Sequence, residues 1–164
     1  MEQLPVAEGK RERNDIADLM ATLQNGNSYT RLQAARALGE IGAPAVGPLV
    51  QALTDRGTCF RWTIAIALAR VGLPAVESLI DVVTTRDDPV RNPAVWALAE
   101  IGDTRAVEAL LEVMVNGATD CSRGLAAAAL LKLGHPAGVA AVEKELLSAN
   151  ETFKGVVFEA VEGL

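Results

Sequence analysis

A glycine recurs along this chain at an almost constant interval. Four glycines each follow an aliphatic residue and lie 30, 30 and 32 residues apart, at Gly42, Gly72, Gly102 and Gly134. An arginine stands eleven positions before every one of them, at Arg31, Arg61, Arg91 and Arg123. A period of about 30 residues is typical of solenoids, in which small structural repeats stack in a row. The chain is therefore predicted to be built from copies of one short repeat.

The half of each repeat that precedes the glycine predicts a helix. Leucine and alanine always stand four and five positions before the glycine, on one face of such a helix. Residues that favour helix N-caps stand fourteen positions before it, at Ser28, Thr58, Asp88 and Asp120. Glycine suits the left-handed conformation that closes a helix, and a proline soon follows three of the four, at Pro44, Pro74 and Pro136. In the third repeat, Pro93 lies five residues after Asp88, where its missing amide predicts a bend.

The other half of each repeat predicts an earlier helix. In the first repeat, apolar residues follow the i, i+3, i+4, i+7 spacing of an amphipathic helix, at Ile16, Leu19, Met20 and Leu23. The second and third repeats hold the same offsets, and the fourth displaces them by one residue. Each repeat is therefore expected to be a pair of helices.

A fifth repeat without a final glycine fits the end of the pattern. Lys154 takes the place of the arginine, and Val157, Phe158 and Val161 take core positions. Glu143 breaks the apolar column of the first helix, as expected of a terminal repeat with one exposed side. The predicted organisation is a polar tail over residues 1–13 and a repeat domain over 14–164, divided at about 14–44, 45–74, 75–105, 106–136 and 137–164.

Composition limits the functions open to the chain. Its net charge of -6 opposes nucleic-acid binding, which depends on Lys and Arg. Two cysteines in 164 residues are too few for a disulfide framework, so a cytoplasmic location is expected. No apolar run approaches the roughly 18 to 20 residues that cross a membrane, and residues 1–13 lack the apolar segment of a secretory signal. Neither a membrane nor a nucleic acid is expected as partner.

The sequence Asp-Pro-Val-Arg…Ala-Leu-Ala-Glu-Ile-Gly, at residues 88–102, resembles a HEAT-like repeat. The short period is similar to the type first described in phycobiliprotein lyases, whereas standard HEAT and armadillo units have about 40 to 47 residues. The resemblance covers about residues 14–164 and implies an all-α solenoid, a right-handed α-α superhelix of about five two-helix repeats. It also implies that the second helices line the concave face.

The most regular polar feature is the arginine ladder, which consists of Arg31, Arg61, Arg91, Arg123 and Lys154. Each member lies near the start of its helix, where the macrodipole disfavours a cation, so a compensating partner is expected. In related repeats this arginine bonds to acidic or carbonyl groups in the neighbouring turn, for which Asp55, Asp87 and Asp120 are candidates here. The ladder is therefore interpreted as structural. The alternative, a track that binds anions, is disfavoured by the acidic balance of the chain.

A stripe on the second helices is predicted to point away from the buried leucines. At about 100° per residue, this stripe includes the positions ten, six and two before each glycine. It holds Trp62, Trp96, Ile66, Arg36, Arg70, Glu100 and Lys132. Exposed tryptophan on a rigid surface is typical of binding hot spots, and the mixed charges favour a protein or peptide partner. The alternative is that the two rings pack on each other between neighbouring helices.

Neither a catalytic site nor a cofactor site is indicated by the sequence. His135 is the only histidine, and a metal site normally needs several ligands. Phosphate loops, serine elbows and Cys-x-x-Cys motifs do not occur. Cys59 and Cys121 hold equivalent positions two repeats apart, on the order of 20 Å by helix packing distance, which predicts free thiols. No cofactor is expected.

The leading hypothesis is a non-enzymatic scaffold that binds a protein or peptide on the concave face of a HEAT-like solenoid. The resemblance suggests one alternative, a phycobilin lyase-like subunit that binds a tetrapyrrole and its acceptor protein. A catalytic activity is suggested by this resemblance alone. A third hypothesis, nucleic-acid binding as in helical-repeat DNA glycosylases, needs a basic concave face. Neither the partner nor the oligomeric state follows from the sequence.

Overall fold

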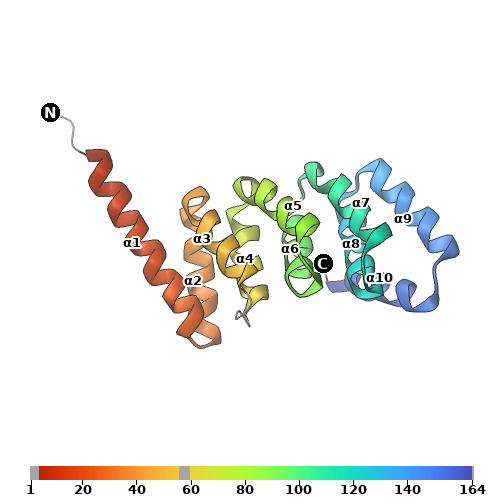
Figure 1. Ribbon diagram of the computed structural model, residues 1–164, viewed down its shortest axis with the longest axis horizontal. Helices are drawn as coiled ribbons and strands as arrows, with labels where there is room; N and C mark the ends of the chain where they lie inside the picture. The colour runs from red at the N-terminus through yellow and green to blue at the C-terminus, as the bar shows by residue number, and fades with distance from the viewer. Residues whose placement is uncertain (1–3, 56–59, 164) are drawn as a thin grey trace. The chain divides into compact units, whose positions relative to one another are not determined.

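Ten α-helices and two short 3₁₀ helices make up the structure, a computed structural model that describes residues 4–55 and 60–163. No strand occurs in these residues, so the predicted all-α fold is confirmed. The helices divide into two compact units, residues 1–71 and residues 72–164. Figure 1 colours the helices in chain order, and each unit is described separately below.

The first unit holds two helix pairs. Its helices are α1 (Leu4–Asn25), α2 (Ser28–Ile41), α3 (Ala43–Thr54) and α4 (Arg61–Val71). The two helices of each pair pack on each other, and the second helices α2 and α4 also pack side by side. Gly39 permits their close approach, because a Cβ at this position would lie only 2.5 Å from the Cβ of Arg70. The second helices therefore form one layer of this unit.

The second unit holds three further helix pairs. Its elements are η1 (Leu73–Ala75), α5 (Val76–Thr85), α6 (Asp88–Ile101), η2 (Thr104–Ala106), α7 (Val107–Asn116), α8 (Asp120–Leu133), α9 (Pro136–Ser148) and α10 (Glu151–Gly163). α5 packs on α6 and α7 on α8, while α6, α8 and α10 pack in succession. Gly124 permits the contact of α8 with α10, because a Cβ there would overlap the side chain of Val156. This unit thus repeats the layer of second helices.

The predicted core columns hold the helices of each unit together. The leucine four positions before each glycine is fully buried, at Leu38, Leu68, Leu98 and Leu130. In the second to fourth repeats, three of the four apolar positions of the first helix are buried, and the fourth is half-buried, at Val50, Ile80 and Leu111. Full burial of one such aliphatic side chain contributes about 1.5 to 3 kcal/mol. The regular period therefore repeats the main source of stability.

The four repeat glycines have positive φ, and among the described residues no other position does. Gly102 and Gly134 adopt the predicted left-handed conformation, with φ and ψ of 76° and 19°, and of 65° and 14°. Gly42 and Gly72 combine φ of 80° and 76° with ψ of -134° and -137°, a region that only glycine enters readily. Each connection from one repeat to the next therefore depends on glycine.

The N-caps lie one residue earlier than predicted. The cap residues are Asn27, Asp87 and Thr119, and the predicted caps are the first residues of their helices: Ser28, Asp88 and Asp120. The side chain of Asn27 accepts a hydrogen bond from the Thr30 amide at 2.9 Å, and that of Thr119 accepts one from Ser122 at 3.1 Å. Two residues able to cap a helix stand next to each other in each turn, and spacing alone does not decide between them. Thr58 lies outside the described residues.

The predicted polar tail is also corrected. α1 begins at Leu4 and passes residue 13 without a break, so residues 4–13 belong to the first helix. Ala7, Glu8, Lys10 and Glu12 are good helix formers, which allows a helix fixed by its apolar face after residue 15 to extend toward the N-terminus. Residues 1–3 lie outside the described part of the chain.

Pro93 lies within α6, which continues through it from Asp88 to Ile101. The ring is buried, so Pro93 is part of the core on this side of the helix. Its missing amide removes one helical hydrogen bond, and the helix remains continuous because the flanking residues Val90, Ala94 and Val95 are buried as well.

The fifth repeat departs from the prediction. Val157 is buried as expected, but Phe158 and Val161 are 64% and 45% exposed, although the equivalent positions of the earlier repeats are fully buried. The reason is that α10 packs chiefly on α8. Phe153 and Val157 enter the core there, and the adjacent side of α10 is left open to solvent. Phe158 and Val161 are called the α10 patch below.

Candidate functional site

The arginine ladder joins the two helices of a repeat. In three repeats, the arginine Nε donates to a carbonyl near the C-terminal end of the preceding helix: Arg61 to Leu53 at 3.0 Å, Arg91 to Val83 at 2.9 Å and Arg123 to Met114 at 2.9 Å. Carbonyls at a helix C-terminus lack partners within the helix and carry the negative end of its dipole. They therefore compensate for a cation placed near the start of the following helix.

Carboxylates add to the ladder, with one difference from the prediction. Asp120 accepts from Arg123 at 3.2 Å, and Asp55 accepts from Arg61 at 2.7 Å through its backbone carbonyl. Arg91 pairs with Asp88 at 2.9 Å, and the predicted partner Asp87 is the N-cap of the helix. Asp88 takes this role because it is the first residue of α6, where a residue three positions before Arg91 lies on the same side of the helix.

The outer members of the ladder have other contacts. Arg31 donates to the carbonyl of Gln24 at 3.2 Å and lies 5.3 Å from the ring centre of Phe60. Lys154 pairs with Glu151 at 2.9 Å. Since the central arginines already donate to carbonyls and carboxylates, these contacts favour the structural interpretation of the ladder over an anion-binding track.

In the first unit, the predicted binding residues lie on α2 and α4. Trp62 is 51% exposed, and Leu32, at the equivalent position of α2, is 45% exposed. Ile66 is half-buried, and both arginines of the stripe are exposed, with Arg36 paired to Glu40 at 3.1 Å. This surface is called the α2–α4 face and consists of Leu32, Arg36, Trp62, Ile66 and Arg70. It combines a large apolar surface with positive charge.

In the second unit, the predicted binding residues lie on α6 and α8. Trp96 is half-buried. Glu100 and Lys132 form an ion pair, although they belong to consecutive repeats. Because both stand two positions before a repeat glycine, the pair places equivalent positions of α6 and α8 side by side. Trp96, Glu100 and Lys132 are called the α6–α8 face, and a hollow of about 250 Å³ adjoins Lys132.

The predicted binding residues thus fall into two groups, one on each compact unit. Trp62 belongs to the first group and Trp96 to the second, and both indoles also contact other residues of the chain. Each group lies on the layer of second helices that the sequence pattern singled out. Their role in binding remains a prediction.

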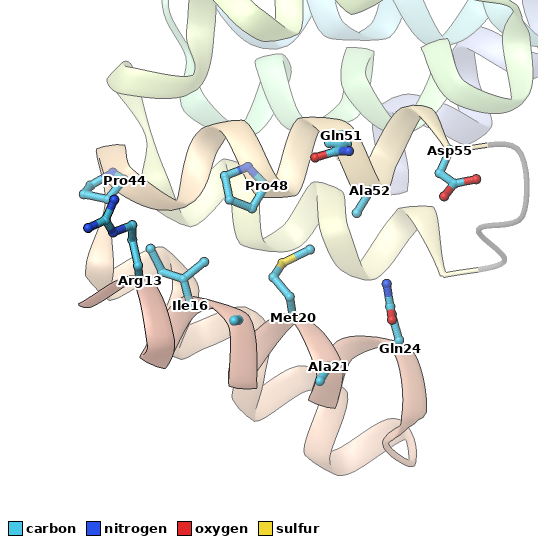
Figure 2. A pocket seen from close by; sticks show the side chains of 11 residues that line it. Arg13, Ile16, Met20, Ala21, Gln24, Pro44, Pro48, Gln51, Ala52 and Asp55 are labelled. Carbon is cyan, nitrogen blue, oxygen red and sulfur yellow. The ribbon is translucent and has the colours of Figure 1, made fainter. Parts of the chain in front are cut away.

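The first unit also contains a groove that the sequence interpretation missed. It lies between α1 and α3, has a volume of about 750 Å³, and is shown in Figure 2. Met20 and Pro48 face each other across its middle, and its lining also includes the small side chains of Ala17, Ala21 and Ala52. A signal for it exists in the sequence, because the third repeat has Glu77 and Asp81 where the first has these two alanines of α1.

Charged side chains close the corresponding place in the second unit. Arg105 bonds to Glu77 at 2.7 Å and to Asp103 at 2.8 Å, linking α5 to the start of the next repeat. The side-chain hydrogen bond from Arg105 lowers the pKa of Asp103 below its ordinary value. Glu77 and Arg105 are exposed and Asp103 is half-buried, so solvent screens the pairs and limits their contribution to stability.

The thiols and the histidine provide no further site. Cys121 is a free, exposed thiol, and Cys59 lies outside the described residues. Over residues 4–55 and 60–163, no three His, Cys, Asp or Glu side chains gather closely enough to hold a metal ion.

Comparison with known families decides the family of the chain. A model of HEAT repeats matches residues 16–98 and residues 48–131, which together span more than half of the sequence. This chain belongs to the HEAT-repeat family. The resemblance seen at residues 88–102 is thereby confirmed. HEAT repeats commonly mediate protein interactions, but this match identifies no partner and gives no support to the lyase-like alternative.

Two further findings concern the relatives of this HEAT-repeat protein and the length of its helices. No curated protein matches the chain. In the described residues, no single helix combines the length and the apolar character needed to cross a membrane. Among the residues that the structure describes, α4 and the segment Leu73–Thr85 meet these requirements only when taken together as a bent pair, and most of their apolar residues are buried.

Proposed function

We propose that this HEAT-repeat protein is a non-enzymatic scaffold that binds a protein or peptide through the α2–α4 face and the α6–α8 face. The observation that carries the proposal is Trp62, which remains 51% exposed on a rigid helix beside the exposed Leu32. Tryptophan buries a large area on binding and loses little side-chain entropy, which makes it the commonest kind of binding hot spot.

The charges of the α2–α4 face define the partner further. Arg36 is paired with Glu40 on the same helix, whereas Arg70 is exposed in the last turn of α4 and forms no ion pair within the described residues of this unit. A partner that presents an apolar side chain to Trp62 and a carboxylate to Arg70 would satisfy both. The α6–α8 face is different, because Glu100 and Lys132 already neutralise each other. A protein surface or peptide with few charges fits it best.

The test compares variants of the two tryptophans. Trp62→Ala, Trp96→Ala and the double variant are used as baits in affinity capture from an extract of the source cells, and captured proteins are quantified against wild type. Loss of a tryptophan hot spot costs at least about 2 kcal/mol, or roughly 30-fold in affinity. We expect proteins captured by wild type to be lost with the double variant.

The matched control is Leu147→Ala, which removes a large apolar side chain that is 88% exposed on α9, a helix that contributes no residue to either face. This control should capture the same proteins as wild type. The melting temperature of every bait is measured by circular dichroism. If Trp62→Ala and Trp96→Ala unfold the protein, the tryptophans serve packing and the proposal fails. It also fails if the folded double variant captures the same proteins as wild type.

A further inference from the structure

The groove between α1 and α3 is more open than the matching part of the second unit. At the end of the groove that holds Gln24 and Gln51, the matching hollow in the second unit has a volume of about 90 Å³, against about 750 Å³ for the whole groove. Its lining includes Thr84, Glu112 and Val113, which are the repeat equivalents of Gln24, Gln51 and Ala52 in the groove. The two spaces therefore occupy the same position in the repeat and are lined by different side chains.

An ion pair accounts for part of this difference. In the second unit, Glu77 on α5 pairs with Arg105 at 2.7 Å and so bridges two successive repeats. The equivalent positions in the first unit are Ala17 and Pro44, both exposed and both uncharged. The groove thus exposes apolar surface where another repeat of the same chain has charged side chains.

The shape of the groove suits a helix. Its lining residues recur every three or four positions on both helices, from Arg13 to Gln24 on α1 and from Pro44 to Asp55 on α3. The twelve positions of each range span about 17 Å of helix, or three turns. Figure 2 shows α1 and α3 side by side, with Arg13 and Pro44 at one end and Gln24 and Asp55 at the other. Small alanines on the floor allow another side chain to enter between the helices.

The α10 patch is an apolar surface that departs from the repeat pattern. Phe158 and Val161 are exposed although the repeat pattern buries their equivalents. Both lie on one side of a helix of 13 residues, which is long enough to fill the three turns of the groove. Met20 on the groove floor is half-buried, and its thioether makes favourable contacts with aromatic rings such as that of Phe158.

The charges of the two surfaces are complementary in one orientation. The groove carries Arg13 at one end and Asp55 at the other, and α10 carries Lys154 and Glu162 on the side of its patch. With α10 antiparallel to α1, Glu162 lies beside Arg13 and Lys154 lies beside Asp55. Lys154 now pairs with Glu151, which is 91% exposed, and such surface pairs are exchanged at little cost.

We propose that the groove between α1 and α3 binds the α10 patch of a second copy of this chain. The contact is heterologous, because the groove of one copy receives the helix of another. The first copy then keeps its α10 patch unused, and the second keeps its groove unused. The α2–α4 face takes no part in this association, whereas the α10 patch borders the α6–α8 face, because Val161 lines the hollow beside Lys132. Trp62→Ala therefore tests the proposed function without altering either surface of this association.

The test uses the full chain in sedimentation velocity over a series of concentrations. The groove variant Ala17→Glu with Pro44→Arg copies the ion pair of the second unit into the first, which fills the groove with residues that the repeat already accommodates. The helix variant Phe158→Glu places a charge on the patch at a position that is already solvent-exposed. We expect wild type to associate as its concentration rises, and each variant to associate at least about tenfold more weakly.

A mixture of the two variants provides the decisive result. The helix variant keeps an intact groove and the groove variant keeps an intact patch, so the mixture should form a one-to-one complex although each variant alone is monomeric. Leu147→Ala and Trp62→Ala should associate as wild type does, and melting curves verify that every variant is folded. The proposal is overturned if wild type stays monomeric, if either folded variant associates normally, or if the mixture stays monomeric.

Discussion

An arginine near the start of a helix faces the positive end of that helix's dipole, yet this chain places one there in repeat after repeat. In the structure, the negative end of the preceding helix compensates for this cation, because carbonyls at that end accept hydrogen bonds from Arg61, Arg91 and Arg123. The position of the arginine was readable from the sequence, since it recurs eleven residues before each glycine. The main acceptor could not be predicted from the sequence, because every residue has a backbone carbonyl. The prediction therefore named nearby acidic residues as the partners.

Replacing Arg91 with alanine should destabilise the protein. The side chain is 18% exposed and donates to the Val83 carbonyl and to Asp88, so its removal leaves both acceptors without these bonds. We expect a loss of about 1 to 3 kcal/mol in the free energy of unfolding, measured by urea denaturation. Arg70→Ala removes an exposed arginine as the control and should change stability by less than about 0.5 kcal/mol. Equal stability of wild type and Arg91→Ala would refute a structural role for the ladder.

At the scale of elements, the sequence predicted where helices lie along the chain better than it predicted which helices pack on each other. Apolar spacing and glycine positions located nine of the helices, and α1 was found but begins earlier than expected. The faces of Phe158 and Val161 were assigned wrongly, because periodicity shows which residues share a side of a helix but not which helix covers that side. The groove between α1 and α3 was missed for the same reason, since it depends on the spacing of two helices.

Two glycines inside helices should respond oppositely to alanine. Gly39 lies where α2 and α4 approach, and a Cβ there would be 2.5 Å from the Cβ of Arg70, so Gly39→Ala should cost about 1 to 3 kcal/mol. Gly47 lies inside α3 with no atom within 4 Å of an added Cβ, and Gly47→Ala should stabilise by about 0.5 to 1 kcal/mol. Thermal and urea unfolding of both variants provide the comparison. Stabilisation by Gly39→Ala would show that the two helices do not need this close approach.

At the scale of the whole molecule, each compact unit has its own buried leucines and its own tryptophan. Repeat proteins gain stability from neighbouring repeats, so a local change acts most strongly nearby. The two predicted binding faces could be read from the sequence because they follow the repeat period. The exposed fraction of each indole could not be predicted from the sequence, because it depends on the side chains of adjacent helices.

The tryptophans allow the two units to be followed separately. Trp96→Phe leaves Trp62 as the fluorescent reporter of the first unit, and Trp62→Phe leaves Trp96 as the reporter of the second. Leu130→Ala in the second unit should cost about 2 to 5 kcal/mol and should lower the urea midpoint reported by Trp96 more than that reported by Trp62. Equal shifts of the two midpoints would show that the chain unfolds as one cooperative block.

The ladder also bears on how such a chain is assembled. Its bonds from Arg61, Arg91 and Arg123 reach back only eight or nine residues, so a hairpin can close soon after its second helix has emerged from the ribosome, before most of the remaining chain exists. Short-range closure of this kind favours rapid folding. A gene duplication that adds one repeat would also add the arginine and the carbonyl that join its two helices. Such proteins can therefore become longer by whole repeats.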